Sequence, residues 1–242
     1  LFGLFILSTF VFSQEQKSQL YAITEIVVKP AMVAKYEAAV KKEIELGYPY
    51  SFSTYSTTDY YYYFIIPIEN YAFMDTMIKA ESEWAKKLGD EYQALMKSIE
   101  GAIEYYRNGF IRYLPELSYI PKKPRLKPEE EKFVCWSYCY VEVGKEKEFA
   151  DIAKQWVELY KSKNIGDGWS TYVVESGTEM PFYFFAMSGK SPADFFNEDE
   201  KAMKKIGQEK SKELGIKMDA LLRKSEFKMG MRRPDLSMPK KK

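Results

Sequence analysis

The 242-residue sequence contains no histidine, and this absence excludes several kinds of catalytic site. It removes Ser-His and Cys-His nucleophile pairs, histidine general bases, histidine-ligated zinc and a histidine axial ligand to haem. Strong haem binding would have to use Tyr, Met or Cys, and we expect it to be absent. We therefore expect a protein that needs no cofactor and no metal.

Cysteine is nearly absent as well, because Cys135 and Cys139 are the only two in the chain. They lie four residues apart in what has the pattern of one strand, so about 3.3 Å per residue would separate them by roughly 13 Å. A disulfide needs Cα atoms within about 7 Å of each other. We predict two buried free thiols, which behave as small apolar side chains.

The chain lacks an excess of charge of either sign, since 36 Lys and Arg residues oppose 35 Asp and Glu residues. No overall field would therefore attract nucleic acid or an anionic membrane. The basic end, Lys240–Lys242, is interpreted as a solvated terminus rather than a binding patch. After the first residues, no apolar stretch is long enough for a membrane helix.

The N-terminal residues 1–13 are mostly apolar and precede a polar Gln-Glu-Gln segment, which predicts a signal peptide. Val11 and Ser13 stand where small or apolar residues precede a cleavage point, although a charged start and an initiator Met are missing. We expect export to the periplasm or the extracellular space. A buried N-terminal strand or helix is the alternative.

The most informative feature that is present is an internal repeat. Three short segments recur in the same order at offsets of 117 to 119 residues: Ser53–Tyr55 as Ser170–Tyr172, Lys86–Glu91 as Lys204–Glu209, and Pro115–Ser118 as Pro234–Ser237. Small loop insertions produce such a drift, so the chain is a duplicated domain. We place the first repeat at 20–121, a proline-rich linker at 122–131 and the second repeat at 132–239.

Both repeats have the pattern strand, helix, strand, strand, helix, strand. The first has predicted strands at 21–28, 51–56, 60–66 and 102–113 and helices at 31–46 and 71–100. The second has strands at 133–143, 168–175, 182–187 and 226–232 and helices at 145–163 and 193–224. A βαββαβ unit of this kind places both helices on one face of a four-stranded antiparallel sheet.

The opposite face of each sheet must also be covered, because Tyr60–Ile66 and Phe182–Met187 are apolar or aromatic at consecutive positions. The simplest cover is the sheet of the other repeat. We predict an α+β fold in which two ferredoxin-like repeats close face to face as an intramolecular dimer, so that the protein is a monomer.

Val28-Lys29-Pro30-Ala31 followed by Tyr36, and Val141–Gly144 followed by Phe149, resemble the strand-to-helix transition of the dimeric α/β-barrel superfamily. The resemblance covers both repeats and implies that two ferredoxin-like units pair into a barrel. The superfamily includes cofactor-free antibiotic-biosynthesis-type monooxygenases, haem-using enzymes, lactone isomerases and members without known activity. The fold therefore does not supply the function.

Aligning Val28 with Val141 predicts which side chains of the two first strands face the barrel interior. Smaller side chains suit the helix-covered face, so Glu25 should point inward from the first repeat. The aromatic residues predicted to line the interior and to bind a ligand are Trp136, Tyr138, Tyr140, Tyr62 or Tyr63, Tyr183, Tyr55 and Tyr172. They predict a pocket for a flat apolar molecule, with hydroxyl groups as polar contacts. An ordinary aromatic core that fills the barrel is the alternative.

Glu25 is the only acid on the predicted interior side of the first strand, where a carboxylate needs a hydrogen-bonding partner or a raised pKa. Arg107 and Arg112 on the last strand of the first repeat are candidate partners. A desolvated Glu25 beside a ligand is a candidate general base. A one-residue register shift would place it on the surface instead.

The repeated Lys86–Glu91 and Pro115–Ser118 segments are interpreted as structural. Gly89 would let a long helix bend or break, and Pro115–Ser118 would end a strand in a turn or an interdomain arm.

Three functions remain open on this basis. The first is an exported protein that holds a small apolar or aromatic molecule between its sheets. The second is a cofactor-independent monooxygenase or isomerase in which Tyr and Trp orient the substrate and Glu25 moves a proton. The third is an interaction protein with a filled barrel. A lumen of a few hundred Å³ that contains Glu25 and an arginine favours the first two, and a solid barrel favours the third.

Overall fold

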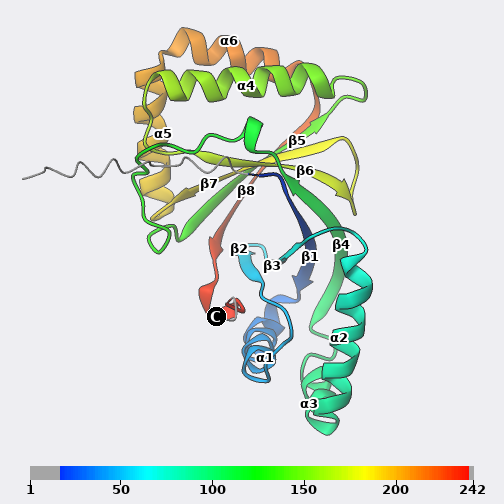
Figure 1. Ribbon diagram of the computed structural model, residues 1–242. Coiled ribbons are helices and arrows are strands. Elements are labelled where there is room, and N and C mark those ends of the chain that lie inside the picture. Colours follow the sequence, from blue (N-terminus) through cyan, green and yellow to red (C-terminus); the bar gives the residue numbers. More distant parts are fainter. Residues whose placement is uncertain (1–16, 240–242) are drawn as a thin grey trace, which may run out of the picture.

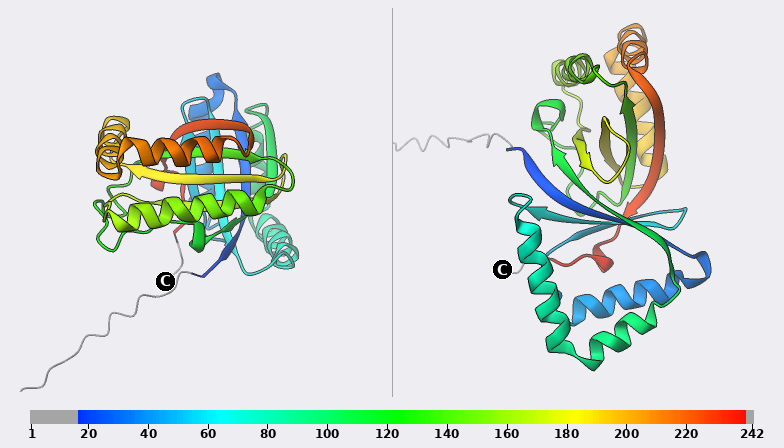
Figure 2. Two further views of the ribbon diagram at one scale, coloured as in Figure 1. Left: turned by 90° about the horizontal axis from the view of Figure 1, so that it is seen from above. Right: turned by 90° about the vertical axis from the view of Figure 1, so that its right-hand side faces the viewer.

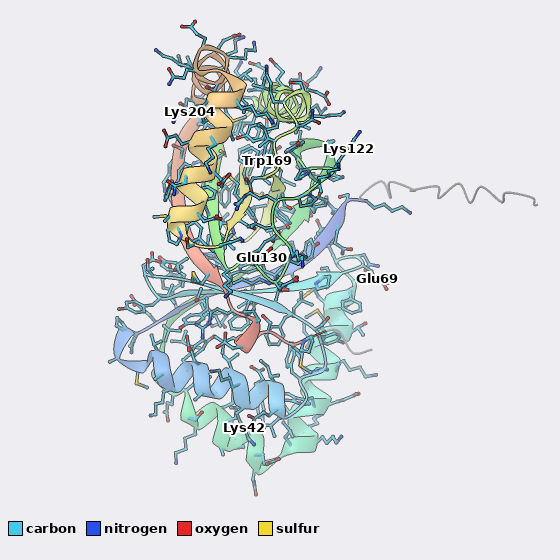
Figure 3. All side chains as sticks on the ribbon, turned by 90° about the vertical axis from the view of Figure 1, so that its left-hand side faces the viewer. Lys42, Glu69, Lys122, Glu130, Trp169 and Lys204 are labelled. Carbon is cyan, nitrogen blue, oxygen red and sulfur yellow. The ribbon has the colours of Figure 1, made fainter. Side chains whose placement is uncertain are left out.

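The computed structural model describes residues 17–239, and in this range eight strands close into one antiparallel barrel (Figure 1). The predicted signal peptide at 1–13 lies outside the described residues. The helices of the two repeats lie at opposite ends of the molecule with the strands between them, as Lys42 on one end and Lys204 on the other show (Figure 3).

Both repeats have the predicted order of elements, except that the second helix is divided in two. The first repeat consists of β1 Gln19–Val28, α1 Val33–Glu45, β2 Ser53–Thr57, β3 Tyr61–Ile68, α2 Phe73–Leu88, α3 Asp90–Ser98 and β4 Ile103–Tyr113. The second consists of β5 Phe133–Val141, α4 Glu146–Ser162, β6 Trp169–Ser176, β7 Phe182–Gly189, α5 Pro192–Ile206, α6 Gln208–Asp219 and β8 Leu222–Arg232. Three short 3-10 helices are η1 Pro30–Met32, η2 Pro115–Leu117 and η3 Pro234–Leu236.

The division of the long helix occurs at a glycine in both repeats. Gly89 has φ +56° and Gly207 has φ +97°, conformations that a side chain with a Cβ rarely adopts. Each glycine ends one helix and precedes the next, so α2 and α3 meet at a marked angle (Figure 2). The predicted break is confirmed, and the repeated Lys-Lys-x-Gly segment has a structural explanation.

The two sheets share one interior and are also hydrogen-bonded edge to edge. The strand order is β1-β3-β2-β8-β5-β7-β6-β4 around the closed barrel. At one seam Tyr55 of β2 lies opposite Arg232 of β8, and at the other Tyr113 of β4 lies opposite Tyr172 of β6. Closure leaves no free sheet edge in the barrel, which confirms the barrel that the resemblance implied.

Each seam is locked by an arm that crosses from the other repeat. The Thr171 hydroxyl donates to the carbonyl of Leu117 in η2 at 2.6 Å, and the Thr54 hydroxyl donates to the carbonyl of Leu236 in η3 at 2.6 Å. Both threonines are fully buried. These matched contacts explain why the Ser-Thr-Tyr and Pro-x-Leu-Ser segments recur together.

The proline-rich linker contains no helix or strand but is anchored to the second repeat. The Arg125 guanidinium forms hydrogen bonds of 2.9 Å with both Asp167 and Asp194. In Figure 3 the linker runs along the second repeat from Lys122 to Glu130, near the junction of the two repeats.

The two cysteines are free and buried, as predicted, and both lie on the helix-facing side of β5. Burial raises the pKa of the Cys135 thiol to about 11 and that of the Cys139 thiol to about 12. Both groups are therefore protonated at neutral pH and act as core side chains.

Candidate ligand-binding cavity

A cavity of about 340 Å³ occupies one end of the barrel interior, where β1 and β5 end and β3, β4, β7 and β8 begin. Both repeats contribute to its wall. Its lining includes Glu25 and Arg107 together with a set of aromatic side chains, so the barrel is not packed solid at this end.

Aromatic rings form much of the cavity wall. Trp136 is buried and has its ring centroid 5.8 Å from those of Tyr55 and Tyr63. Further along the same strand β5, Tyr140 stacks on Phe182 of β7 with a centroid separation of 4.4 Å and an interplanar angle of 4°. Such walls favour a flat apolar ligand that can stack or make edge contacts.

Glu25 faces this cavity and forms an ion pair with Arg107, which lies opposite it on β4. Arg107 Nη2 is 3.4 Å from Glu25 Oε1, and the glutamate side chain is 17% exposed. Among the described residues no donor forms a hydrogen bond to the buried Oε1 atom. The other candidate partner, Arg112, instead pairs with Glu175 across the β4–β6 seam at 2.5 Å.

Strand β8 contributes three charged side chains to the cavity, Lys224, Glu226 and Lys228. Lys224 and Glu226 form an ion pair at 2.5 Å. Lys228 Nζ donates to the Tyr63 hydroxyl at 3.3 Å and lies 3.8 Å from the centroid of the Tyr61 ring. The interior therefore combines apolar rings with fixed charges.

Burial raises the pKa of Tyr63 and that of Tyr138 well above the usual value for a phenol. Their hydroxyl groups are neutral at physiological pH, so each can donate one hydrogen bond and accept others.

The two repeats supply equivalent positions to the cavity but different residues. Glu25 pairs in register with Arg107, and the corresponding pair in the second repeat is Tyr138 with Glu226. The cavity is therefore asymmetric, and a ligand meets a different set of polar groups on each side.

Most residues predicted for the site lie on the cavity: Glu25, Tyr55, Tyr63, Arg107, Trp136, Tyr138 and Tyr140. Tyr172 also points into the barrel, but it packs beyond the cavity against Phe184, with ring centroids 4.9 Å apart, and against Tyr21.

Two interior assignments are wrong. Tyr62 faces α1, where its ring lies 5.1 Å from that of Tyr36 and its hydroxyl donates to Glu37 at 2.7 Å. Tyr183 faces α4 and packs on Phe149 at 4.9 Å. Side chains alternate along a strand, so the neighbours of these tyrosines face the cavity. A run of consecutive aromatic residues carries no such alternation in its sequence and cannot reveal which members point inward.

Sequence reasoning missed several cavity residues: Tyr61, Tyr105, Phe182, Phe184, Lys224, Glu226 and Lys228. The alternation of charged and uncharged residues from Lys224 to Met229 was a usable signal. It is inverted relative to the common pattern, because the outward-facing Phe227 is 67% exposed while charged side chains face the interior.

A second cavity of about 250 Å³ lies between α1, α3 and the outer face of the first sheet. Its lining is apolar except for a few groups that include Glu43 and Tyr48. Burial, with a smaller contribution from the nearby Glu81 carboxylate, raises the pKa of Glu43 to about 7. The alignment of Val28 with Val141 places Trp156 of the second repeat at the position that corresponds to Glu43.

The described residues contain no group of three or more Asp, Glu or Cys side chains arranged to hold a metal ion. Within the same range, none of the helices combines the length and the apolar character that crossing a membrane requires.

Comparison with known proteins finds similarity in structure only. No protein-family profile and no curated protein matches the chain. A solved anthrone oxidase-like protein superposes with a TM-score of 0.62 at 11% identity, covering 90% of this chain and 92% of that one. The fold is that of a dimeric α/β barrel.

Other dimeric α/β barrels superpose over similar lengths. A candidate monooxygenase from Lactobacillus acidophilus NCFM has a TM-score of 0.54 at 10% identity, covering 89% of this chain and 94% of that one. A chlorite dismutase variant from Candidatus Nitrospira defluvii has a TM-score of 0.51 at 9% identity, covering 91% and 94%. At these identities the likeness establishes the fold alone.

Proposed function

We propose that this protein binds a small, flat, apolar or aromatic molecule in the barrel cavity. The observation that supports this function is the open volume of about 340 Å³ between aromatic walls, with Glu25 and Arg107 at the same site. Ligand pockets in proteins start at roughly 300 Å³. An interaction protein with a filled barrel would not need this volume.

Binding of a neutral ring compound to wild-type and cavity-filled protein tests the proposal. Isothermal calorimetry with 2-naphthamide should show saturable one-to-one binding to the wild type. Ile23→Trp places a larger side chain in the cavity and should weaken binding at least ten-fold. Ile78→Trp is the matched control, because Ile78 is 60% exposed on α2, and its affinity should equal that of the wild type.

Circular dichroism of each variant checks that the fold is kept. The proposal is wrong if a panel of one-ring to three-ring compounds shows no saturable binding to the wild type, or if folded Ile23→Trp protein binds as well as the wild type.

A second candidate is cofactor-independent oxygenation or isomerisation in the same cavity. The anthrone oxidase-like and monooxygenase neighbours favour it, as does the position of Glu25, whose Oε1 atom has no hydrogen-bond donor among the described residues. In this scheme the rings orient the substrate and Glu25 accepts its acidic proton. Oxygen consumption with a phenolic substrate, lost in Glu25→Gln, would support it.

We extend the proposal to an exported protein that is a monomer in solution. The apolar segment at 1–13 supports export, and the closed barrel within one chain supports the monomer. Mass determination of the mature N-terminus and sedimentation analysis test these two points.

A further inference from the structure

Three basic side chains line the cavity, and they differ in whether a carboxylate neutralises them. Arg107 pairs with Glu25, and Lys224 pairs with Glu226. Within residues 17–239, no carboxylate oxygen lies within 4.0 Å of the Lys228 ammonium group. Lys228 is therefore the cation at this site whose charge lacks a direct counter-ion in the described chain.

Aromatic side chains, rather than a carboxylate in direct contact, surround the Lys228 ammonium group. The side chain is half-buried, its ammonium group lies 3.8 Å from the Tyr61 ring centroid and 5.8 Å from that of Tyr138, and it donates one hydrogen bond to Tyr63. Aromatic faces attract a cation, but an ammonium group has three donors. The remaining donors can bind an anionic group in the cavity.

An anion at Lys228 would be part of a ligand that also has a ring, because the adjoining wall is aromatic. Trp136, Tyr138 and Phe182 lie on the same cavity and offer ring contacts. The Tyr63 hydroxyl accepts from Lys228, so this phenol holds the ammonium group beside the aromatic wall. A planar carboxylate attached to an aromatic ring matches this combination.

Resting on the proposed function, we propose that the cavity selects aromatic carboxylates and that Lys228 is the residue that binds the carboxylate. The two repeats differ at this position, so only the second repeat supplies a lysine here. Trp136 lies opposite Lys228 on β8, whereas the equivalent Ile23 of the first repeat lies opposite Gly109 on β4. A ligand therefore binds with its carboxylate toward the second repeat.

The test compares two probes of nearly equal shape, 2-naphthoate and the uncharged 2-naphthamide, by calorimetry at pH 7.5. Wild-type protein should bind 2-naphthoate at least ten-fold more tightly than it binds 2-naphthamide. Lys228→Gln should lose at least ten-fold in affinity for 2-naphthoate while its affinity for 2-naphthamide changes less than two-fold. Lys228→Arg keeps the positive charge and should retain most of the preference.

Lys224→Gln is the matched control, because Lys224 lies on the same strand and lines the same cavity but is already neutralised by Glu226. Its preference for 2-naphthoate should change less than three-fold. Equal binding of the two probes to the wild type, a preference that survives Lys228→Gln, or an equal loss in Lys224→Gln would each overturn the inference and leave the proposed function standing. Binding of neither probe would contradict both.

Discussion

Replacing Glu43 with glutamine should stabilise the protein at pH 8 and have little effect at pH 4. Glu43 lies on α1 at the edge of the second cavity, where burial and then the Glu81 carboxylate raise its pKa from 4.5 to about 7. In the unfolded chain the same carboxyl group loses its proton near the ordinary value. The folded protein therefore binds one more proton than the unfolded chain between these two pH values.

The sign and the size of the effect follow from this difference. Because the folded-state pKa of an acid is raised, the free energy of unfolding falls as pH rises from about 4.5 to about 7 and stays low above that. A shift of about 2.5 units corresponds to an upper limit of about 3 kcal/mol. Glu43 keeps partial contact with solvent, so we expect about 1–3 kcal/mol. Glutamine cannot ionise and avoids this loss.

Urea unfolding followed by far-UV circular dichroism at pH 4, 5, 6, 7 and 8 measures the difference between variant and wild type. The advantage of Glu43→Gln should grow between pH 5 and pH 7 and then level off. Glu45→Gln on the same helix is the control, because its side chain is 70% exposed and its difference should stay within about 0.5 kcal/mol. A difference for Glu43→Gln that is constant with pH, or that shrinks as pH rises, would refute the reasoning.

Three further predictions concern the seams and the core. Thr54→Val removes the donor to the buried Leu236 carbonyl and should lower the free energy of unfolding by about 1–3 kcal/mol. Ser53→Ala at the exposed neighbouring position should change the free energy of unfolding by less than about 0.5 kcal/mol. Equal effects of the two variants in urea titrations would contradict the locking role of the arm. Gly230→Ala would bring a Cβ within 2.4 Å of the Ser56 carbonyl oxygen at the β2–β8 seam, so we expect a lower melting temperature, whereas Gly215→Ala in α6 meets no atom within 4 Å and should not lower it. Finally, burial raises the pKa of the Cys135 thiol to about 11 and that of the Cys139 thiol to about 12, so neither should react with a disulfide reagent at pH 8 in native protein. Two thiols should react after unfolding. Rapid reaction of a native thiol would show that β5 is not buried as described.

The residue pattern predicted the architecture because duplication and periodicity are properties of the residue order itself. Alternation along the first strand of each repeat placed Trp136, Tyr138 and Tyr140 on one face and the two cysteines on the other, as the structure has them. The break at Gly89 was also visible, since a glycine recurs within the repeated segment of a long helical pattern.

Where the pattern had no period, the prediction failed. In Tyr60–Ile66 every residue is apolar or aromatic, so Tyr62 and Tyr63 were equivalent until strand pairing assigned one to α1 and the other to the cavity. Lys224, Glu226 and Lys228 were missed for a related reason, because charged alternate positions normally face water.

What the chain determines by itself is therefore the pair of repeats, their order of strands and helices, and the aromatic character of the surface between them. The repeats follow from matching segments about 118 residues apart, and the elements and their aromatic faces follow from side-chain size and spacing over a few residues. Only the tertiary structure decided the register at the two seams, the crossing of each arm to the other repeat, and the position of Lys228 beside Glu25 and Arg107 around one open volume. Those features depend on contacts between segments far apart in the chain, whose geometry is set by closure of the barrel.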